Sequence, residues 1–436
     1  MNDYPNALKK RLESIILEMS ESPELFVKNP GHDFTRKRKL PFEIMLQILL
    51  SMGGNSLCKE LLDYWECDEN SATTEAFIQQ RDKILPFAFE FLFHEFTDSC
   101  RVTKKYRGYR MLADDGTRLL IATNPNDPDT FSRNKPDDKG FNSIHMNAMY
   151  DLLNKLYVDA LYQPYNYMNE HKGLRDMTDR SQIKEPVILT CDRGLECYNN
   201  FAHIERKGWK YVIRVKDRDS SGILSGLSLP KTDEFDITVN RILTRKYTKE
   251  VRAHPEIYRY LSPSAHFDFF DEQNPFYPIS FRVLRLKISD DTYETVITNL
   301  DQTEFFPQEI KAIYNMRWGI ETSFRKLKYA VGLVNFHAKK REFIIQEIFA
   351  RLIMYNFAEM IISNIIISKT DTKHAYQVNF THAIHVCRKF IRLWNKAPPP
   401  DIEAVIRKNI LPIRPDRKGN RNFRSQSVIS FVYRVA

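Results

Sequence analysis

Three acidic residues stand where predicted secondary structure would bring carboxylates together. Asp115 ends a predicted strand, Asp192 directly follows the apolar run 187–191, and Glu321 lies in a predicted helix 305–328. Carboxylates from two neighbouring strand ends and one helix can hold a pair of divalent cations, the arrangement used for in-line displacement at phosphorus. The alternative for each aspartate taken singly is a turn or a helix cap.

The helix that carries Glu321 also aligns three other polar side chains. Tyr314, Arg317, Glu321 and Lys328 fall on one side of a helix that turns about 100° per residue. One acid among two cations and a tyrosine is typical of a site where a metal and a phosphate meet. A solvated face with i,i+4 ion pairs is the alternative, but it leaves the aligned tyrosine unexplained.

The spacing of this helix, Tyr-x2-Arg-x3-Glu-x6-Lys, resembles the signature of the DDE transposases in the insertion-sequence-four family. The segments Asp115-Gly116-Thr117 and Asp192-Arg193-Gly194 resemble that family's first and second aspartate motifs, in the same order. Further similarity lies at Asn299-Leu300, Gly332-Leu333 and Met354-Tyr355-Asn356, so the resemblance spans most of residues 110–357.

The resemblance implies a ribonuclease-H-like α/β fold: a mixed sheet flanked by helices, with an inserted β-rich domain and a helical N-terminal DNA-binding unit. It implies that Asp115, Asp192 and Glu321 hold two Mg²⁺ ions, which Mn²⁺ can replace, and that these ions activate water and later a DNA 3′-hydroxyl. The residues that would contact DNA are Tyr314, Arg317, Lys328, Arg193, Arg214 and Lys216.

The pattern of predicted elements divides the chain into five parts. A helical DNA-binding unit (1–105) precedes the first part of the catalytic core (106–216), a β-rich insertion (217–300), the second part of the core (301–368) and a basic C-terminal region (369–436). Within the core we expect two strands, 109–115 and 118–122, around a turn at Gly116. The basic run 36–39 suits either a phosphate grip or a solvated loop, and the tail 411–434 is basic as well.

Composition agrees with a polyanionic partner. The 436 residues carry a net charge of +9 and a pI of about 9.0, and cations placed on phosphates release condensed counterions. Six scattered cysteines without a CxxC pair favour reduced thiols and no zinc module. The start has no apolar signal region, and the apolar stretch 347–368 contains Arg351 and Glu359, so we expect a soluble protein in a prokaryotic cytoplasm, on the nucleoid.

Two departures from the family pattern matter. Asp114 lies beside Asp115, and only the residue before glycine matches the motif. The predicted insertion has no tryptophan to trap a flipped base, although its aromatics could stack one, so a hairpin step stays open: Tyr258, Tyr260, Phe269, Phe270, Phe276 and Tyr277.

We therefore expect a cut-and-paste transposase that acts on double-stranded DNA, at the terminal inverted repeats and the target, as a homodimer when bound. A DNA-binding protein without catalysis and a ribonuclease-H-fold nuclease without strand transfer are the alternatives.

Overall fold

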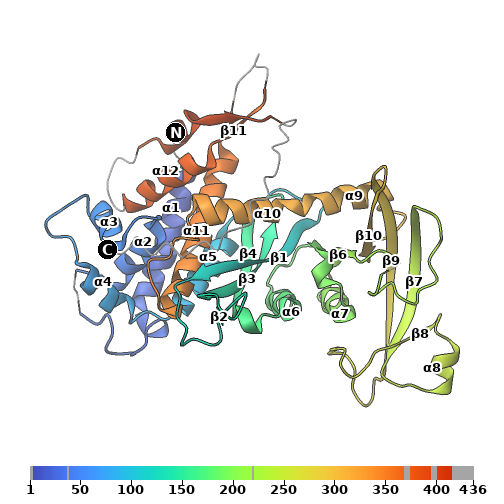
Figure 1. The fold of residues 1–436 in the computed structure, drawn as a ribbon. Coiled ribbons are helices and arrows are strands. Elements are labelled where there is room, and N and C mark those ends of the chain that lie inside the picture. Colours follow the sequence, from blue (N-terminus) through green and yellow to red (C-terminus); the bar gives the residue numbers. More distant parts are fainter. Residues whose placement is uncertain (1–2, 37–38, 219, 368–373, 394–399, 415–436) are drawn as a thin grey trace.

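A ten-stranded mixed sheet runs through the protein, with helices on both of its faces (Figure 1). The computed structural model describes residues 3–36, 39–218, 220–367, 374–393 and 400–414. The strand order is β2-β3-β1-β5-β6-β10-β9-β7-β8, and β4 also pairs with β3. The expectation of a mixed α/β fold is confirmed.

Six strands form the half of the sheet that carries the acidic motifs. β1 (Arg110–Ile121), β3 (Phe141–Asp151) and β4 (Leu156–Pro164) make an antiparallel meander, with the short β2 (Phe131–Ser132) on its edge. β5 (Val187–Cys191) and β6 (Lys210–Val215) then join parallel to β1, connected through α6 (Glu170–Arg180) and α7 (Tyr198–Arg206). This topology, three antiparallel strands followed by two parallel ones, is ribonuclease-H-like.

The two faces of β1 pack against different helices, because successive side chains of a strand alternate. Ala113 packs in one core with Ile320 and Phe324, whereas Leu112 packs on the other face with Leu174 of α6. The odd-numbered face of β1 is therefore the one that meets the Glu321 helix.

The predicted turn at Gly116 is wrong, because β1 continues through it as one strand of 12 residues. Gly116 pairs with Asn147 of β3 inside the antiparallel ladder. Glycine is required there for close approach instead of turning: a Cβ on Gly116 would lie 2.4 Å from Nε2 of His145 and 2.6 Å from Oε1 of Glu170.

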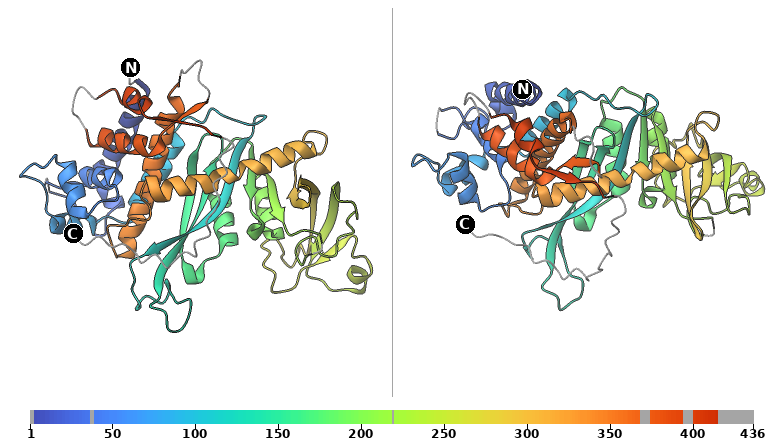
Figure 2. Two further views of the ribbon diagram at one scale, coloured as in Figure 1. Left: turned by 45° about the horizontal axis from the view of Figure 1, so that its top comes forward. Right: turned by 90° about the horizontal axis from the view of Figure 1, so that it is seen from above.

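Beyond β6 the same sheet continues into the β-rich region. β10 (Thr292–Thr298) pairs with β6, and β9 (Phe276–Ser289), β7 (Phe235–Thr244) and β8 (Tyr258–Tyr260) follow outward. These strands and the short α8 (Lys249–Ala253) extend away from the helices at the other end of the molecule (Figure 2). The long β9 pairs with β10 on one side and with β7 on the other, so it connects the strands next to the core with the outer strands.

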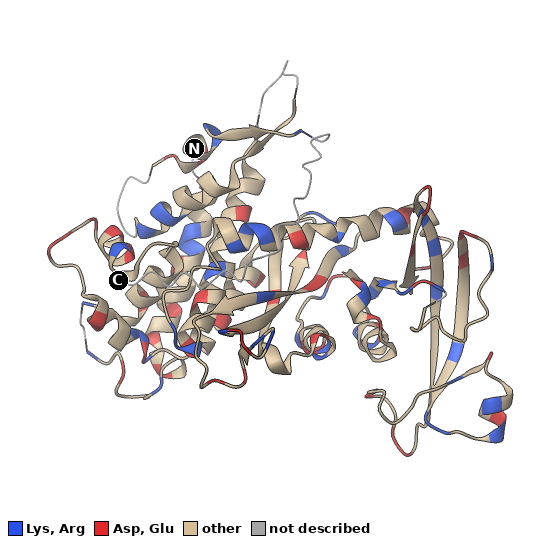
Figure 3. Cartoon of the chain, viewed as in Figure 1, with Lys and Arg blue, Asp and Glu red and all other residues tan. Residues whose placement is uncertain are grey.

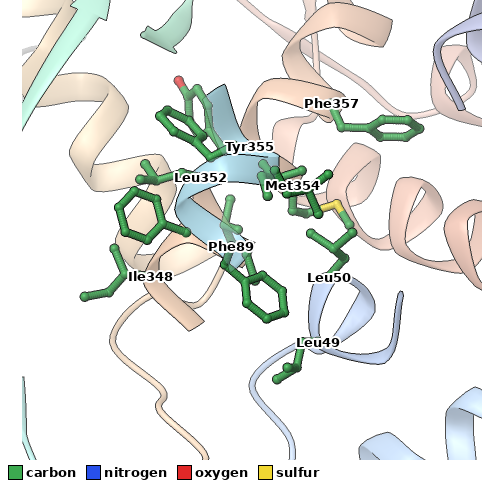
Figure 4. Close-up of a cluster of buried hydrophobic side chains, with 14 of the residues drawn as sticks. Leu49, Leu50, Phe89, Ile348, Leu352, Met354, Tyr355 and Phe357 are labelled. Atoms are coloured by element: carbon green, nitrogen blue, oxygen red, sulfur yellow. The ribbon is translucent and has the colours of Figure 1, made fainter. Parts of the chain in front are cut away.

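Helices from both ends of the chain pack into one hydrophobic core. α11 (Arg341–Asn364) is buried on almost all sides, and Figure 4 shows its Leu352 and Met354 among side chains of α2 and α5. The surrounding helices are α1 (Asp3–Glu21), α2 (Phe42–Ser51), α3 (Leu57–Tyr64), α4 (Thr74–Arg81), α5 (Phe87–Ser99), α12 (Phe380–Arg392) and α13 (Ile402–Arg407). A two-stranded sheet of β11 (Tyr376–Val378) and β12 (Ile410–Pro412) lies beside them.

Buried polar contacts connect α11 to its neighbours. Arg81 of α4 donates to Gln346, to Glu347 and to the carbonyl of Phe343. The amide of Asn356 reaches both backbone groups of Tyr157 in β4, at 2.9 and 2.8 Å. The helical region is thus fastened to the sheet through the middle of α11.

The helix expected over 305–328 forms one rod across the edge of the sheet (Figure 1). It consists of α9 (Pro307–Met316), α10 (Trp318–Arg325) and a π-helical turn (Lys326–Ala330), and Arg317 between the first two keeps helical dihedral angles. We call residues 307–330 the signature helix. π-helical turns are rare in proteins, but those that occur are often found at functional sites. This one carries Lys328.

Two of the sequence features lie partly outside the described residues: Lys37 and Arg38 of the first basic run, and the tail from residue 415 onward. Within the described part, none of the helices is both long and apolar enough to span a membrane.

Candidate active site

Parallel pairing of β1 and β5 places the two aspartate motifs next to each other. Asp114 is in register with Cys191, the last residue of β5, so Asp115 and Asp192 are the next residues along two adjacent strands. Asp115 has the odd-numbered parity of Ala113 and faces the signature helix, while Asp114 faces the α6 side. The predicted neighbourhood of Asp115 and Asp192 is present.

The signature helix meets this point with its polar side. The Tyr314 hydroxyl donates to Oδ1 of Asp192 at 3.3 Å, and Nη2 of Arg317 donates to Oε1 of Glu321 at 3.0 Å. Lys328 donates from Nζ to the carbonyl oxygen of Arg118 in β1, at 3.1 Å. Figure 3 shows acidic and basic residues interspersed along this helix. The four aligned residues therefore lie beside β1 and the end of β5 and are not a purely solvated face.

Electrostatic coupling connects all three carboxylates. Burial raises the pKa of Asp115 to about 6, the Gly116 amide and Arg317 oppose this, and the charges of Glu321 and Asp192 add to it. Oδ1 of Asp115 accepts the Gly116 amide at 2.8 Å. Burial also lowers the pKa of Lys328, and the charge of Asp115 partly restores it. Asp115 is thus close enough to feel the charges of both Asp192 and Glu321.

The donor set fits a hard divalent cation. Three carboxylates supply only oxygen ligands, and the side chains of Asp192 and Glu321 are 48% and 40% exposed, so solvent and a phosphate can reach them. Among the described residues, no three His, Cys, Asp or Glu side chains are already arranged to hold one ion. Mg²⁺ is commonly bound by one or two carboxylates together with water and substrate phosphates, so a complete protein cage is not required.

The remaining predicted DNA-contacting residues separate into two groups. Arg214 of β6 lies at the site, with Nη1 3.8 Å from Oδ1 of Asp192 and 3.6 Å from Oε1 of Glu294. Arg193 and Lys216 are exposed, and Lys216 donates from Nζ to the carbonyl of Ser221 at 3.0 Å. Arg214 therefore belongs to the cluster, and the other two lie on the surface around it.

The aromatic residues of the β-rich region are not equally available for stacking. Tyr260 and Phe276 are exposed, whereas Phe269, Phe270 and Tyr277 pack with the buried Phe267. Tyr260 and Phe276 therefore have the most accessible rings of the six candidates. Tyr258 is half-buried and packs against Phe276.

One pair of residues beside the aspartate motifs was not predicted from the sequence. His145 of β3 and Glu170 at the start of α6 are 3.1 Å apart and lie against Gly116. The glycine was the available signal, but a glycine after an aspartate is equally typical of a turn.

One family of known proteins matches the part of the chain that carries this site. The family described as "Transposase DDE domain" matches residues 106–357, more than half of the chain and the whole of the site. One similar solved structure is titled "Cryo-EM structure of piggyBac transposase synaptic complex with hairpin DNA (SNHP)", with a TM-score of 0.46 and 11% identity over 97% of this chain and 88% of that chain. No curated protein matches. The chain belongs to the transposase DDE domain family.

Proposed function

We propose that this protein is a transposase of the insertion-sequence-four type, which cuts its element out of DNA and joins the ends to a new site. The observation that carries the proposal is the electrostatic coupling of Asp115, in the middle of β1, to Asp192 just after β5 and to Glu321 of the signature helix. Tyr314 of the same helix donates to Asp192. Membership of the transposase DDE domain family supports the same reading.

Asp115, Asp192 and Glu321 would hold the divalent cations, Mg²⁺ or Mn²⁺. When bound, these ions lower the pKa of a water or a 3′-hydroxyl and neutralise charge that develops on the phosphate. Tyr314 orients Asp192 through its hydroxyl, and Arg317 holds Glu321 from the same helix. The acids are therefore set in place before DNA arrives, which reduces the reorganisation needed for catalysis.

The cations of the protein would bind the phosphodiester that is cut. Arg317 is buried and rests over the Tyr314 and Trp318 rings, so its guanidinium has little freedom and can present a fixed set of donors. Lys328 and Arg214 approach from the β1 and β6 sides. Arg193 and Lys216 would contact the DNA farther from the cut, because they lie on the exposed rim.

The partners of this activity would be the terminal inverted repeats of the element and a target duplex, bound by two copies of the chain so that both ends are cut together. The protein would work on the nucleoid of a prokaryotic cell.

The test uses linear DNA that carries the element's own ends. With Mg²⁺, the full chain should release those ends and join them to a supercoiled plasmid, and Glu321→Gln should bind the ends without cutting them. Asp176→Asn is the control, since it removes one exposed carboxylate from α6, away from the site. Cutting without joined products would identify a nuclease, and binding without cutting by the wild type would identify a DNA-binding protein; either result contradicts the proposal.

A further inference from the structure

The environment of Gly116 is the tightest feature beside the acidic motifs. A Cβ at this position would meet the imidazole of His145 at 2.4 and 2.6 Å and the carboxylate of Glu170 at 2.6 Å, distances that real Cβ atoms essentially never show. Gly194, two residues after Asp192, provides a contrast. A Cβ there would meet only Oε2 of Glu170, at an ordinary van der Waals distance of 3.7 Å. Side chains from β3 and α6 thus press directly on the backbone next to Asp115.

These two side chains form a fixed pair. Nε2 of His145 lies 3.1 Å from Oε1 of Glu170, and the imidazole is almost completely buried while the carboxylate is partly exposed. The contact with His145 lowers the pKa of Glu170, and burial and the nearby charge of Asp192 oppose this effect. Asn169 caps α6 by accepting the Lys172 amide, so the helix begins at a defined place and holds Glu170 there.

A short chain of contacts leads from the pair to Asp115. His145 and Glu170 press on Gly116, and the Gly116 amide donates to Oδ1 of Asp115 at 2.8 Å. On the opposite face of β1, Arg317 holds Glu321 at 3.0 Å. One face of the strand therefore carries the His145–Glu170 pair and the other the Arg317–Glu321 pair, and Asp115-Gly116 lies between the two.

We propose that His145 and Glu170 are positioning residues: by confining Gly116 they set the direction of the Asp115 carboxylate, and hence the geometry in which it can bind a cation. This inference rests on the proposed role of Asp115. Neither residue needs to touch substrate, because both act through the backbone of Gly116.

The experiment measures Mn²⁺ affinity by paramagnetic resonance for the full chain bound to an oligonucleotide of its element end. Gly116→Ala should weaken Mn²⁺ binding by about 10–100-fold, the effect typical of removing support from a metal ligand. His145→Ala should weaken it by about tenfold. Removing the ring leaves only the end of the flexible Glu170 side chain against the new methyl group, so the double variant Gly116→Ala/His145→Ala should bind Mn²⁺ no more weakly than Gly116→Ala alone.

Three controls make the result specific. Gly194→Ala should bind Mn²⁺ within about twofold of the wild type, since its methyl group has room. Glu170→Gln keeps the volume and a hydrogen-bonding oxygen, so it should retain most of the affinity that Glu170→Ala loses. Melting temperature and end-DNA affinity are measured for every variant, to separate a loss of positioning from a loss of folding.

A lower melting temperature with unchanged Mn²⁺ affinity in Gly116→Ala and His145→Ala would overturn the proposal, because the pair would then only pack. Additive losses in the double variant would also overturn it. Asp115→Asn separates this outcome from a failure of the proposed function: if Asp115→Asn binds Mn²⁺ like the wild type, the role of Asp115 itself is wrong.

Discussion

Asp114 and Asp115 are consecutive residues of β1 whose carboxylates lie on opposite faces of the sheet. Asp115 is coupled to Arg317, Glu321 and Asp192, whereas Asp114 is fully buried on the α6 side. Burial raises the pKa of Asp114 well above its usual range, the charge of Asp115 adds to this, and no described residue donates a hydrogen bond to either oxygen of Asp114. Burial and the charge of Asp115 therefore both favour the protonated form of Asp114, and Asp115 is the neighbour that is coupled to the other two acids of the site.

The two neighbours consequently respond differently to the same substitution. Asp115→Asn should abolish end cleavage while binding of the end persists, because cation coordination is lost. Asp114→Asn replaces a buried carboxyl on the opposite face of β1 by an amide of the same shape, so cleavage should stay within a few-fold of the wild type. The measurement is single-turnover cleavage of a labelled element end; the reverse ranking would show that Asp114 is the catalytic residue.

The pKa of Asp115, about 6, gives the activity a defined pH dependence. Since cation binding requires the ionised carboxylate, Mn²⁺ affinity should fall as the pH drops through about 6. Asp114→Asn should leave this profile in place. A profile that is flat between pH 5 and 7.5 would contradict the assigned pKa.

The contribution of Asp115 to the free energy of unfolding should change with pH in the opposite direction, decreasing as the pH rises. The folded chain binds this proton more tightly than the unfolded chain, whose aspartate has a pKa of about 3.9, so the stabilisation is present below about pH 4 and is lost as the pH rises through about 6. At pH 7.5, Asp115→Asn should therefore be more stable than the wild type, by roughly 1–3 kcal/mol. Urea unfolding at pH 4 and at pH 7.5 checks this, and the gain should be absent at pH 4.

Phosphate binding should depend on the cations of the signature helix. Arg317→Ala and Lys328→Ala should each weaken binding of the cleaved end and flatten its salt dependence by roughly one counterion per contact. Tyr314→Phe loses only the 3.3 Å hydrogen bond to Asp192, about 0.5–1.5 kcal/mol, so its effect should be smaller. End affinity across a salt series, with the exposed Lys172→Ala as control, makes the comparison. An unchanged slope in Arg317→Ala would mean that this guanidinium serves only Glu321.

The helical region should depend on one buried ion pair. Arg81 lies 3.0 Å from Glu347, both side chains are almost completely buried, and Arg81 also donates to Gln346 and the Phe343 carbonyl. Arg81→Met leaves those acceptors without this donor, so the chain should lose about 3–5 kcal/mol of stability. Chemical denaturation tests this against Lys83→Met, which removes a cation two residues away. A loss below about 1 kcal/mol would show that His337 and Arg351 compensate Glu347 without Arg81.

Much of the candidate site could be predicted from sequence because its signals are local. The apolar run 187–191 became β5 with Asp192 immediately after it, and the aligned residues 314–328 became one rod. Alternation along a strand and rotation along a helix depend on neighbouring residues only, so these patterns are legible in one dimension. The mixed α/β class followed from the order of the elements for the same reason.

The tertiary structure alone decided which residues meet. That β1 runs straight through Gly116 depends on His145 and Glu170, which come from other elements and occupy the space that a side chain would need. Asp115 faces the signature helix and Asp114 faces α6 because different helices cover the two faces of β1. That difference is a property of packing between distant segments. Likewise, strands β7 to β10 extend the core sheet only because β10 finds an open edge at β6. Contacts of this kind are set by long-range complementarity of shape and charge, which no local sequence pattern contains.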